Sequence, residues 1–98
     1  MSDIILEFPA GFEAYEWEVT AKGWFPGVVA VIHGRRYRLT IYDPARLAQD
    51  IEEALKVGRV FLERNVVVVA SVTRANIASA LEEVVQTGRL GDVQPDQV

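Results

Sequence analysis

The stretch VVAVIHGRRYRLTIY, residues 28–42, decides the fold, because it has the pattern of two strands joined by a tight turn. Residues 28–32 are apolar at every position, which is typical of a central strand with both faces covered. Residues 33–36 supply the turn, since Gly34 tolerates a positive φ. In the return strand, residues 37–42, apolar and polar side chains alternate, so one face is predicted to be buried. The inward residues are Tyr37, Leu39 and Ile41, and the outward residues are Arg36, Arg38 and Thr40.

The residues before this hairpin predict two further strands. Ile4 to Phe8 is short and apolar and is followed by Pro9, which favours a strand at the edge of the sheet. Residues 15–22 alternate between apolar and polar side chains, which is the period of a half-buried strand. Residues 23–27, GWFPG, contain the glycines and the proline of a turn. The first 42 residues therefore predict an antiparallel β-meander.

The residues after the hairpin change to helical spacing. Asp43 is a good N-cap and Pro44 suits the first helical position, so we predict a helix that runs to about Val57. Gly58 is typical of the position that follows a helix. The apolar stripe of this helix consists of Leu47, Ile51, Ala54 and Leu55.

Further strands and a second helix follow. Val60 to Leu62 and Val66 to Val72 predict one or two strands, and the four consecutive valines indicate burial on both faces. Thr73 is the second N-cap, and the second helix is predicted from Arg74 to about Thr87. Its apolar side consists of Ile77, Leu81, Val84 and Val85, and Gly88 ends it.

The two helical segments resemble each other at a spacing of 30 residues. Residues 51–60, IEEALKVGRV, align with residues 81–90, LEEVVQTGRL, and the caps Asp43 and Thr73 fall in the same register. We interpret this likeness as two amphipathic helices that each end at a glycine, because two copies are too few for a repeat protein. The likeness still supports placing both helices on the same face of the sheet.

The predicted fold class is α+β. Residues 1–90 form one domain, in which an antiparallel β-meander of three or four strands is followed by helix, strand and helix. Two helices are expected to pack on one face of a mixed sheet. Residues 91–98 are polar, and we expect them to form a frayed tail.

The composition describes a small, acidic, cysteine-free chain. It has 98 residues, a net charge of −4 and no cysteine, which excludes disulfides and thiol chemistry and favours a cytoplasmic setting. The longest apolar run, residues 66–70, is far shorter than a membrane span, so we expect no membrane insertion. Half of the residues are hydrophobic. This indicates either a large core or apolar surface covered by another chain, and we favour the second, as in a homodimer.

The sequence offers no pattern for catalysis or metal binding. His33 is the only histidine, and it stands in a predicted turn without the spacing of a metal site. No serine lies in a nucleophile elbow, and no glycine-rich phosphate loop is present. The paired carboxylates fall on predicted solvent faces. We therefore expect no catalytic residue, no metal, no cofactor and no enzymatic activity.

The favoured functional hypothesis is protein–protein interaction. An aromatic pair in a turn between strands is typical of an interface anchor when it is exposed. Residues 1–18 carry five acids and no base, so neighbouring strands would gather an acidic patch that attracts a basic partner. The chain would then act as an inhibitor, immunity or accessory protein that also binds itself. The interface candidates are Trp24, Phe25, Glu13, Glu16 and Glu18.

Two alternatives stay open. The first is a small RNA-binding module that uses Arg35, Arg36, Arg38 and Tyr37 for phosphate contacts and stacking. The acidic net charge argues against it, and alternate arginines also protect an edge strand from pairing with another sheet. The second alternative is a ligand-binding or enzymatic domain with a pocket between the sheet and the helices.

Overall fold

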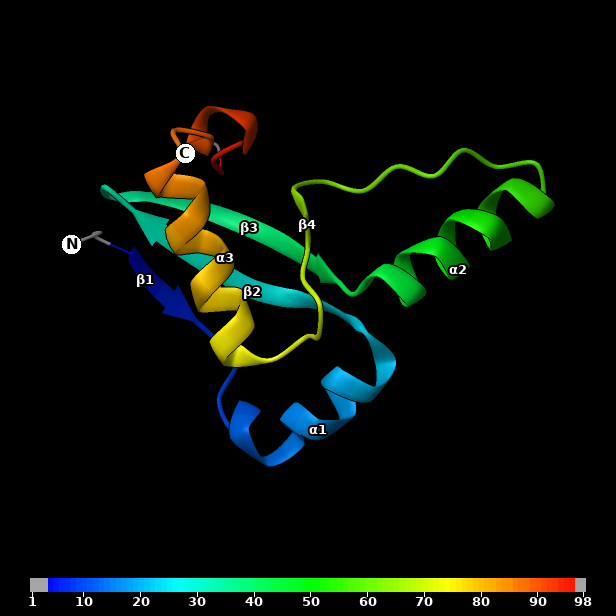
Figure 1. Ribbon diagram of the computed structural model, residues 1–98, viewed down its shortest axis with the longest axis horizontal. Coiled ribbons are helices and arrows are strands. Elements are labelled where there is room, and N and C mark those ends of the chain that lie inside the picture. The colour runs from blue at the N-terminus through cyan, green and yellow to red at the C-terminus, as the bar shows by residue number, and fades with distance from the viewer. Residues whose placement is uncertain (1–3, 97–98) are drawn as a thin grey trace.

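The computed structural model describes residues 4–96 and has the α+β class that the sequence predicts (Figure 1). Four strands form one sheet in the order β1-β2-β3-β4. Neighbours pair antiparallel from β1 to β3, and β4 pairs parallel with β3. The elements are β1 (Ile4–Glu7), α1 (Phe12–Lys22), β2 (Trp24–Ile32), β3 (Arg35–Tyr42), α2 (Pro44–Lys56), β4 (Val66–Val68), α3 (Arg74–Gln86) and the 3₁₀ helix η1 (Leu90–Asp92).

The predicted hairpin is confirmed as the centre of the sheet. Ile32 pairs with Arg35, so two residues close the turn, and both have positive φ, 51° at His33 and 80° at Gly34. This is the turn geometry whose twist matches that of the flanking strands. The inward side chains of the hairpin are buried: Val28, Ala30, Ile32, Tyr37, Leu39 and Ile41.

The prediction of a strand at Tyr15–Lys22 is wrong, because these residues lie in α1. Helix α1 separates its apolar and polar side chains only weakly, so the sequence shows no clear helical period that competes with the alternation. Phe12 and Val19 are two helical turns apart and are both buried, while Trp17, on the side expected to be buried, is 69% exposed. Local pattern does not decide between strand and helix here. The helix is favoured because it brings Phe12 and Val19 together against the sheet.

The turn predicted at residues 23–27 is replaced by a helix end and a bulged strand. Gly23 ends α1 with φ 70°, and a Cβ there would overlap the Asp43 carboxylate, so glycine is required. Pro26 and Gly27 lie inside β2, where the register with β3 shifts between Phe25 and Val28. One extra residue on β2 is accommodated there as a bulge.

The predicted helix–strand–helix order of the second half is confirmed, but its strands are shorter than expected. Only Val66–Val68 pairs with β3, and residues 60–62 form no strand. The prediction that the valine run is buried on both faces is wrong, since β4 is an edge strand and Val68 is 46% exposed. Its short pairing with β3 leaves the other side of the valine run without a neighbouring strand.

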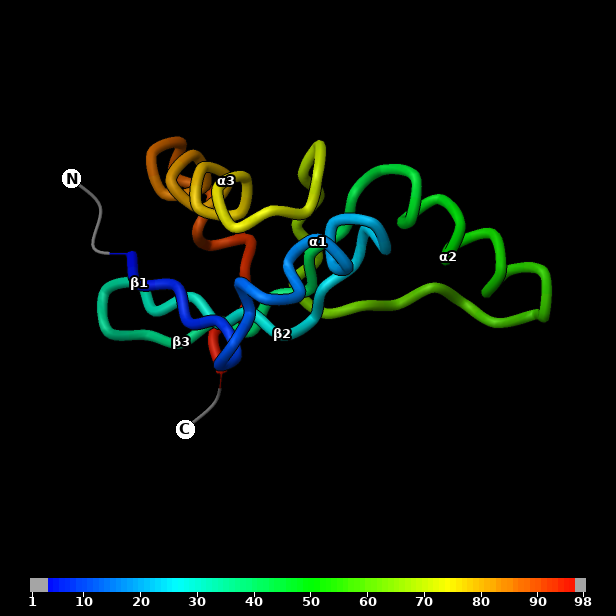
Figure 2. The backbone as a smooth tube through the Cα atoms, turned by 90° about the horizontal axis from the view of Figure 1, so that it is seen from below, coloured from blue at the N-terminus to red at the C-terminus, as the bar shows by residue number. Residues whose placement is uncertain are grey.

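Helices α1 and α3 cover one face of the sheet, whereas α2 leaves the body of the molecule. Phe12 and Val19 of α1 and Ile77 and Leu81 of α3 share one core with the hairpin. Both views show α2 projecting beyond the end of β3, with the chain returning beside it (Figures 1 and 2). Two helices do pack on one face, as predicted, but α1 takes the place expected for α2.

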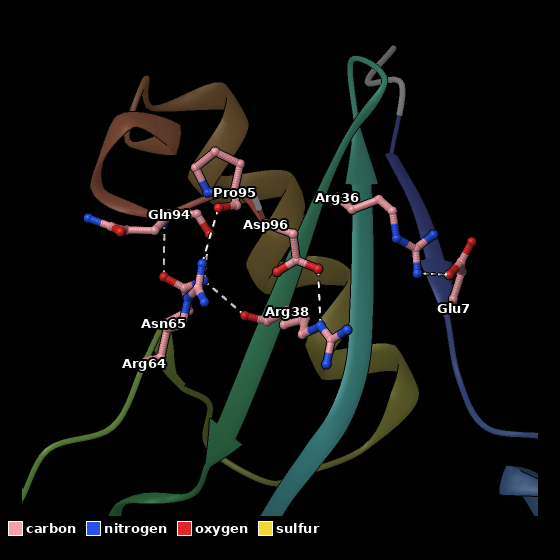
Figure 3. Close-up of polar contacts among 8 residues, drawn as sticks. All are labelled: Glu7, Arg36, Arg38, Arg64, Asn65, Gln94, Pro95 and Asp96. Carbon is pink, nitrogen blue, oxygen red and sulfur yellow. Dashed lines mark hydrogen bonds and ion pairs between the residues drawn. The ribbon is translucent and has the colours of Figure 1, made fainter. Parts of the chain in front are cut away.

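Residues 94–96 lie along the edge of β3 that β4 leaves uncovered (Figure 3). The side-chain amide of Asn65 donates to the Arg38 and Gln94 carbonyl oxygens and accepts from the Gln94 N–H. The Asp96 N–H donates to the Arg36 carbonyl oxygen at 2.8 Å. These contacts are not those of the frayed tail that the sequence predicts, and residues 97–98 lie outside the described residues.

Candidate interaction surface

The projecting arm, residues 44–65, is the part of the molecule whose apolar side chains are least covered. It consists of α2 and the return segment, residues 57–65 (Figure 1). Apolar and polar side chains are separated more sharply in α2 than in α1 or α3, yet α2 has no buried residue. An amphipathic helix of a globular protein normally buries its apolar stripe. The stripe of α2 is therefore available for contact with another surface.

Large apolar side chains are exposed on the last turn of α2 and on the return segment. Leu55 and Val57 are 62% and 71% exposed. Val60 and Leu62 on the return segment are 82% and 85% exposed. Single exposed apolar residues are ordinary, but a group of them on one projecting element is typical of an interface.

A hydrogen-bonded cluster holds the inner end of the arm against the sheet. The Tyr42 hydroxyl donates to the Asp50 carboxylate at 2.8 Å, and Arg46 Nε donates to the same carboxylate at 2.9 Å. The Tyr42 ring also meets the Phe61 ring edge-on, at 6.2 Å between centroids. These contacts fasten the first turns of α2 and the middle of the return segment.

This cluster shifts two pKa values in opposite directions. Burial, the hydrogen bond to Asp50 and the charge of Asp50 raise the pKa of Tyr42 to about 12. Burial acts to raise the pKa of Asp50, but hydrogen bonds from Arg46 and Tyr42 and the Arg46 charge outweigh it. The pKa of Asp50 therefore lies below its usual value. The cluster is stable with Tyr42 neutral and Asp50 charged.

The predicted aromatic pair is divided between the root of the arm and the core. Trp24 is half-buried, and the Arg46 guanidinium lies 5.3 Å from the centre of its ring. Its indole Nε1 is buried and has no hydrogen-bond partner among residues 4–96. Phe25 is 7% exposed and packs against Phe8 and Phe12. Trp24 thus borders the arm, whereas Phe25 belongs to the core.

The predicted acidic residues are divided between two elements: Glu7 lies on β1 and pairs with Arg36, and the other three described acids lie on α1. Glu16 accepts a hydrogen bond from the Arg74 N–H at the start of α3, and Glu13 forms an ion pair with the Arg74 guanidinium at 3.4 Å. Glu18 is exposed. The patch was expected from two neighbouring strands, and the helix places these side chains around its axis instead. Asp3, expected in the same patch, lies outside the described residues.

The basic hairpin lacks the aromatic platform that RNA stacking needs. Arg36 forms an ion pair with Glu7, and Arg38 forms one with Asp96, both at 3.0 Å (Figure 3). Tyr37 points to the opposite face of the sheet and is 4% exposed. Arg35 is exposed at the turn. Stacking on Tyr37 beside these arginines is therefore not possible in this arrangement.

A cleft of about 1260 Å³ lies between β4, α3 and the segment after α3. It occupies the place where the sequence leaves open a pocket between sheet and helix. Arg38 and Arg89 at this cleft pair with Asp96 and Glu83. Among the described residues, no charged or polar side chain is classed as buried and no acidic or histidine cluster suits a metal ion.

Sequence reasoning missed the exposed end of the arm. Leu55 was assigned to a buried stripe, and Val60 and Leu62 to a strand, because both patterns normally indicate burial. The signal that was present is the high apolar content of the chain, which favoured a second covering chain. A high apolar content does not show which apolar residues are exposed.

Within residues 4–96, every helix is too short or too polar to cross a lipid bilayer. Comparison of the chain with protein-family models, with curated protein sequences and with solved structures found no match.

Proposed function

We propose that this chain is a non-enzymatic protein-interaction domain and that the arm is its contact surface. The observation that supports the proposal is the uncovered apolar surface of the arm, above all Val60 and Leu62 at more than four-fifths exposure. Burying an exposed leucine or valine side chain favours association by about 1.5–3 kcal/mol. A partner that covers the arm would therefore recover free energy that the chain does not gain by folding alone.

The proposal includes self-association, as the composition indicates, and an inhibitor or accessory role in which binding itself is the action. The absence of cysteine fits a cytoplasmic setting. Among the sequence-predicted candidates, Trp24 would act indirectly, because it lies at the root of the arm under Arg46. The hydrogen-bonded root would keep α2 in place while the outer end of the arm binds.

A photo-crosslinking amino acid at position 62 tests this proposal. The matched control carries the same group at position 17, because Trp17 is also an exposed apolar residue but lies on α1. We expect defined protein adducts, with a second copy or another protein, from position 62 and few from position 17. Equal adducts from both positions, or none from position 62, would contradict the arm as the contact surface.

A further inference from the structure

Residues 59–63 form an extended segment whose backbone has no strand partner. The Arg59 N–H completes the end of α2 by donating to the Ala54 carbonyl oxygen. No hydrogen bond joins the backbone of residues 60–63 to another described residue. Valine, phenylalanine and leucine occupy the middle of the segment, and β-branched and aromatic residues are enriched in strands. The backbone N–H and C=O groups of this segment are therefore available to pair with a strand of another chain.

The sequence of this segment, RVFLE, is complementary to itself in antiparallel order. If Phe61 lies opposite the same residue of a second copy, Arg59 lies opposite Glu63. Val60 then lies opposite Leu62. Residues directly opposite each other in antiparallel strands have side chains on the same face, so each pair joins like with like or charge with countercharge.

Neighbouring registers lose this complementarity. A shift of one residue in one direction places Arg59 opposite Leu62. A shift in the other direction places Arg59 opposite Arg64 and Glu63 opposite Val60. Like charges, or a charge facing an apolar residue, disfavour both. Only the register centred on Phe61 satisfies all five residues.

The exposure of the side chains agrees with this register. Val60 and Leu62 alternate with Phe61 and are far more exposed than it is, since the Phe61 ring meets Tyr42. Pairing centred on Phe61 would gather two valines and two leucines on the outer face of the joined strands. Covering these four side chains supplies the apolar burial, and the backbone hydrogen bonds fix the register.

We infer that two copies of this chain associate about a two-fold axis through antiparallel pairing of residues 59–63, centred on Phe61. The inference rests on the proposed function and names its partner as a second copy. A symmetric dimer requires a self-complementary patch, and the charges of this segment supply one. The segment carries one positive and one negative residue, so neither a basic nor an acidic foreign strand is favoured by its net charge.

Charge reversal at the two ends of the segment tests the register. Each of R59E and E63R places like charges opposite each other twice in the dimer, so sedimentation should show dimer dissociation constants raised about tenfold or more. The double variant R59E/E63R restores opposite charges and should return the constant toward the wild-type value. The control E83R/R89E swaps the charges of an exposed ion pair that lies outside the arm and should leave the constant unchanged. Circular dichroism checks that each variant is folded.

A single cysteine provides an independent measurement, because the chain contains none. Opposite residues in antiparallel strands have Cα atoms about 4.5–5.5 Å apart, which is within the range of a disulfide. F61C should therefore form a disulfide-linked dimer under mild oxidation much faster than E83C, whose cysteine lies at an exposed position of α3 outside the arm. Formation at equal rates would overturn the pairing.

The outcomes distinguish this inference from the proposed function. A chain that stays monomeric at all concentrations, while position 62 still crosslinks to another protein, overturns the dimer and keeps the arm as a binding surface. If the double variant dimerises no more tightly than R59E or E63R alone, the register centred on Phe61 is wrong. Restored association in the double variant, together with the F61C disulfide, establishes it.

Discussion

Helices α2 and α3 are built alike, yet only α3 is packed. Each has 13 residues and begins after a side-chain cap, with Asp43 accepting from the Arg46 N–H and Thr73 from the Asn76 N–H. Each ends at a glycine with φ above 70°, at Gly58 and Gly88. In α3, Ile77 and Leu81 are 0% and 1% exposed. Thirty residues earlier, Leu47 and Ile51 of α2 are only half-buried.

The difference arises in the connections rather than in the helices. A single residue, Asp43, separates β3 from α2, so the helix continues outward from the end of the strand (Figure 1). Five residues, 69–73, separate β4 from α3 and turn the chain back over the sheet, with Val69 and Val72 buried in the core. Caps and end residues specify that a helix forms, and the length of the connection decides what it covers.

Truncation of matched positions should give the largest difference between the two helices. Leu81→Ala removes a fully buried side chain and should lower the free energy of unfolding by about 2–5 kcal/mol. Ile51→Ala, at the corresponding position of α2, should lower it by less than about 1.5 kcal/mol in dilute protein, because solvent already reaches this site. Urea unfolding measures both. Equal losses would show that α2 is packed as firmly as α3.

The root of the arm should respond to pH at both ends of the scale. Because the folded pKa of Asp50 is depressed, its stabilisation is complete above its usual pKa of 3.8 and is lost as the pH falls through the depressed value. Because the pKa of Tyr42 is raised from 10.0 to about 12, its stabilisation is complete below about pH 10 and declines between pH 10 and 12.

Tyr42→Phe removes the hydrogen bond that contributes to both pKa shifts, beside burial at Tyr42 and the Arg46 hydrogen bond at Asp50. At pH 7 the variant should lose about 1–2 kcal/mol of unfolding free energy. The difference in unfolding free energy between the variant and the wild type should become smaller below pH 4 and above pH 10. Urea unfolding at several pH values measures it. A difference that is constant from acid to alkaline pH would show that the hydrogen bond does not form. Tyr42 and Asp50 both lie at the root of the arm, so the comparison reports on this part of the molecule.

Removal of the helix caps should give the smallest changes in stability. The cap of α3 should affect global unfolding, whereas the cap of α2 should affect local opening. Thr73→Ala should lower the free energy of global unfolding by about 1 kcal/mol, because α3 unfolds with the core. Asp43→Ala should act mainly within the arm and raise amide hydrogen exchange at the start of α2, because the outer helix opens without the core. If Asp43→Ala instead raised exchange throughout the hairpin, α2 would belong to the same cooperative unit as α3.

The parts of the fold that local signals specify could be predicted from the sequence. The hairpin follows from Gly34 and its flanking apolar residues, and both helices of the second half follow from their caps and terminal glycines. Helix α1 could not be predicted, because residues 15–22 alternate as in a strand and show almost no helical period. The helix is recognised only from the packing of Phe12 and Val19 in the core.

The candidate surface could be predicted less well than the fold. The high apolar content of the chain indicated that some apolar surface is exposed. Its position could not be predicted, because it depends on the direction in which α2 leaves β3, and no local sequence pattern specifies that direction. Trp24 was expected as an anchor because it is aromatic and lies near a turn. The structure places Trp24 under Arg46, at the root of the arm and away from its exposed apolar side chains.

The Asn65 amide and the Asp96 N–H cover a stretch of sheet edge that another strand would otherwise meet. They occupy the Arg38 and Arg36 carbonyl oxygens on the stretch of β3 that β4 does not reach. A chain cut after Gly91 would lose the Asp96 N–H and expose the Arg36 carbonyl oxygen to pairing with another strand, while the Asn65 bond to Arg38 would remain. Loss of this cover should make the shortened chain more prone to aggregate than the full chain, as light scattering would show.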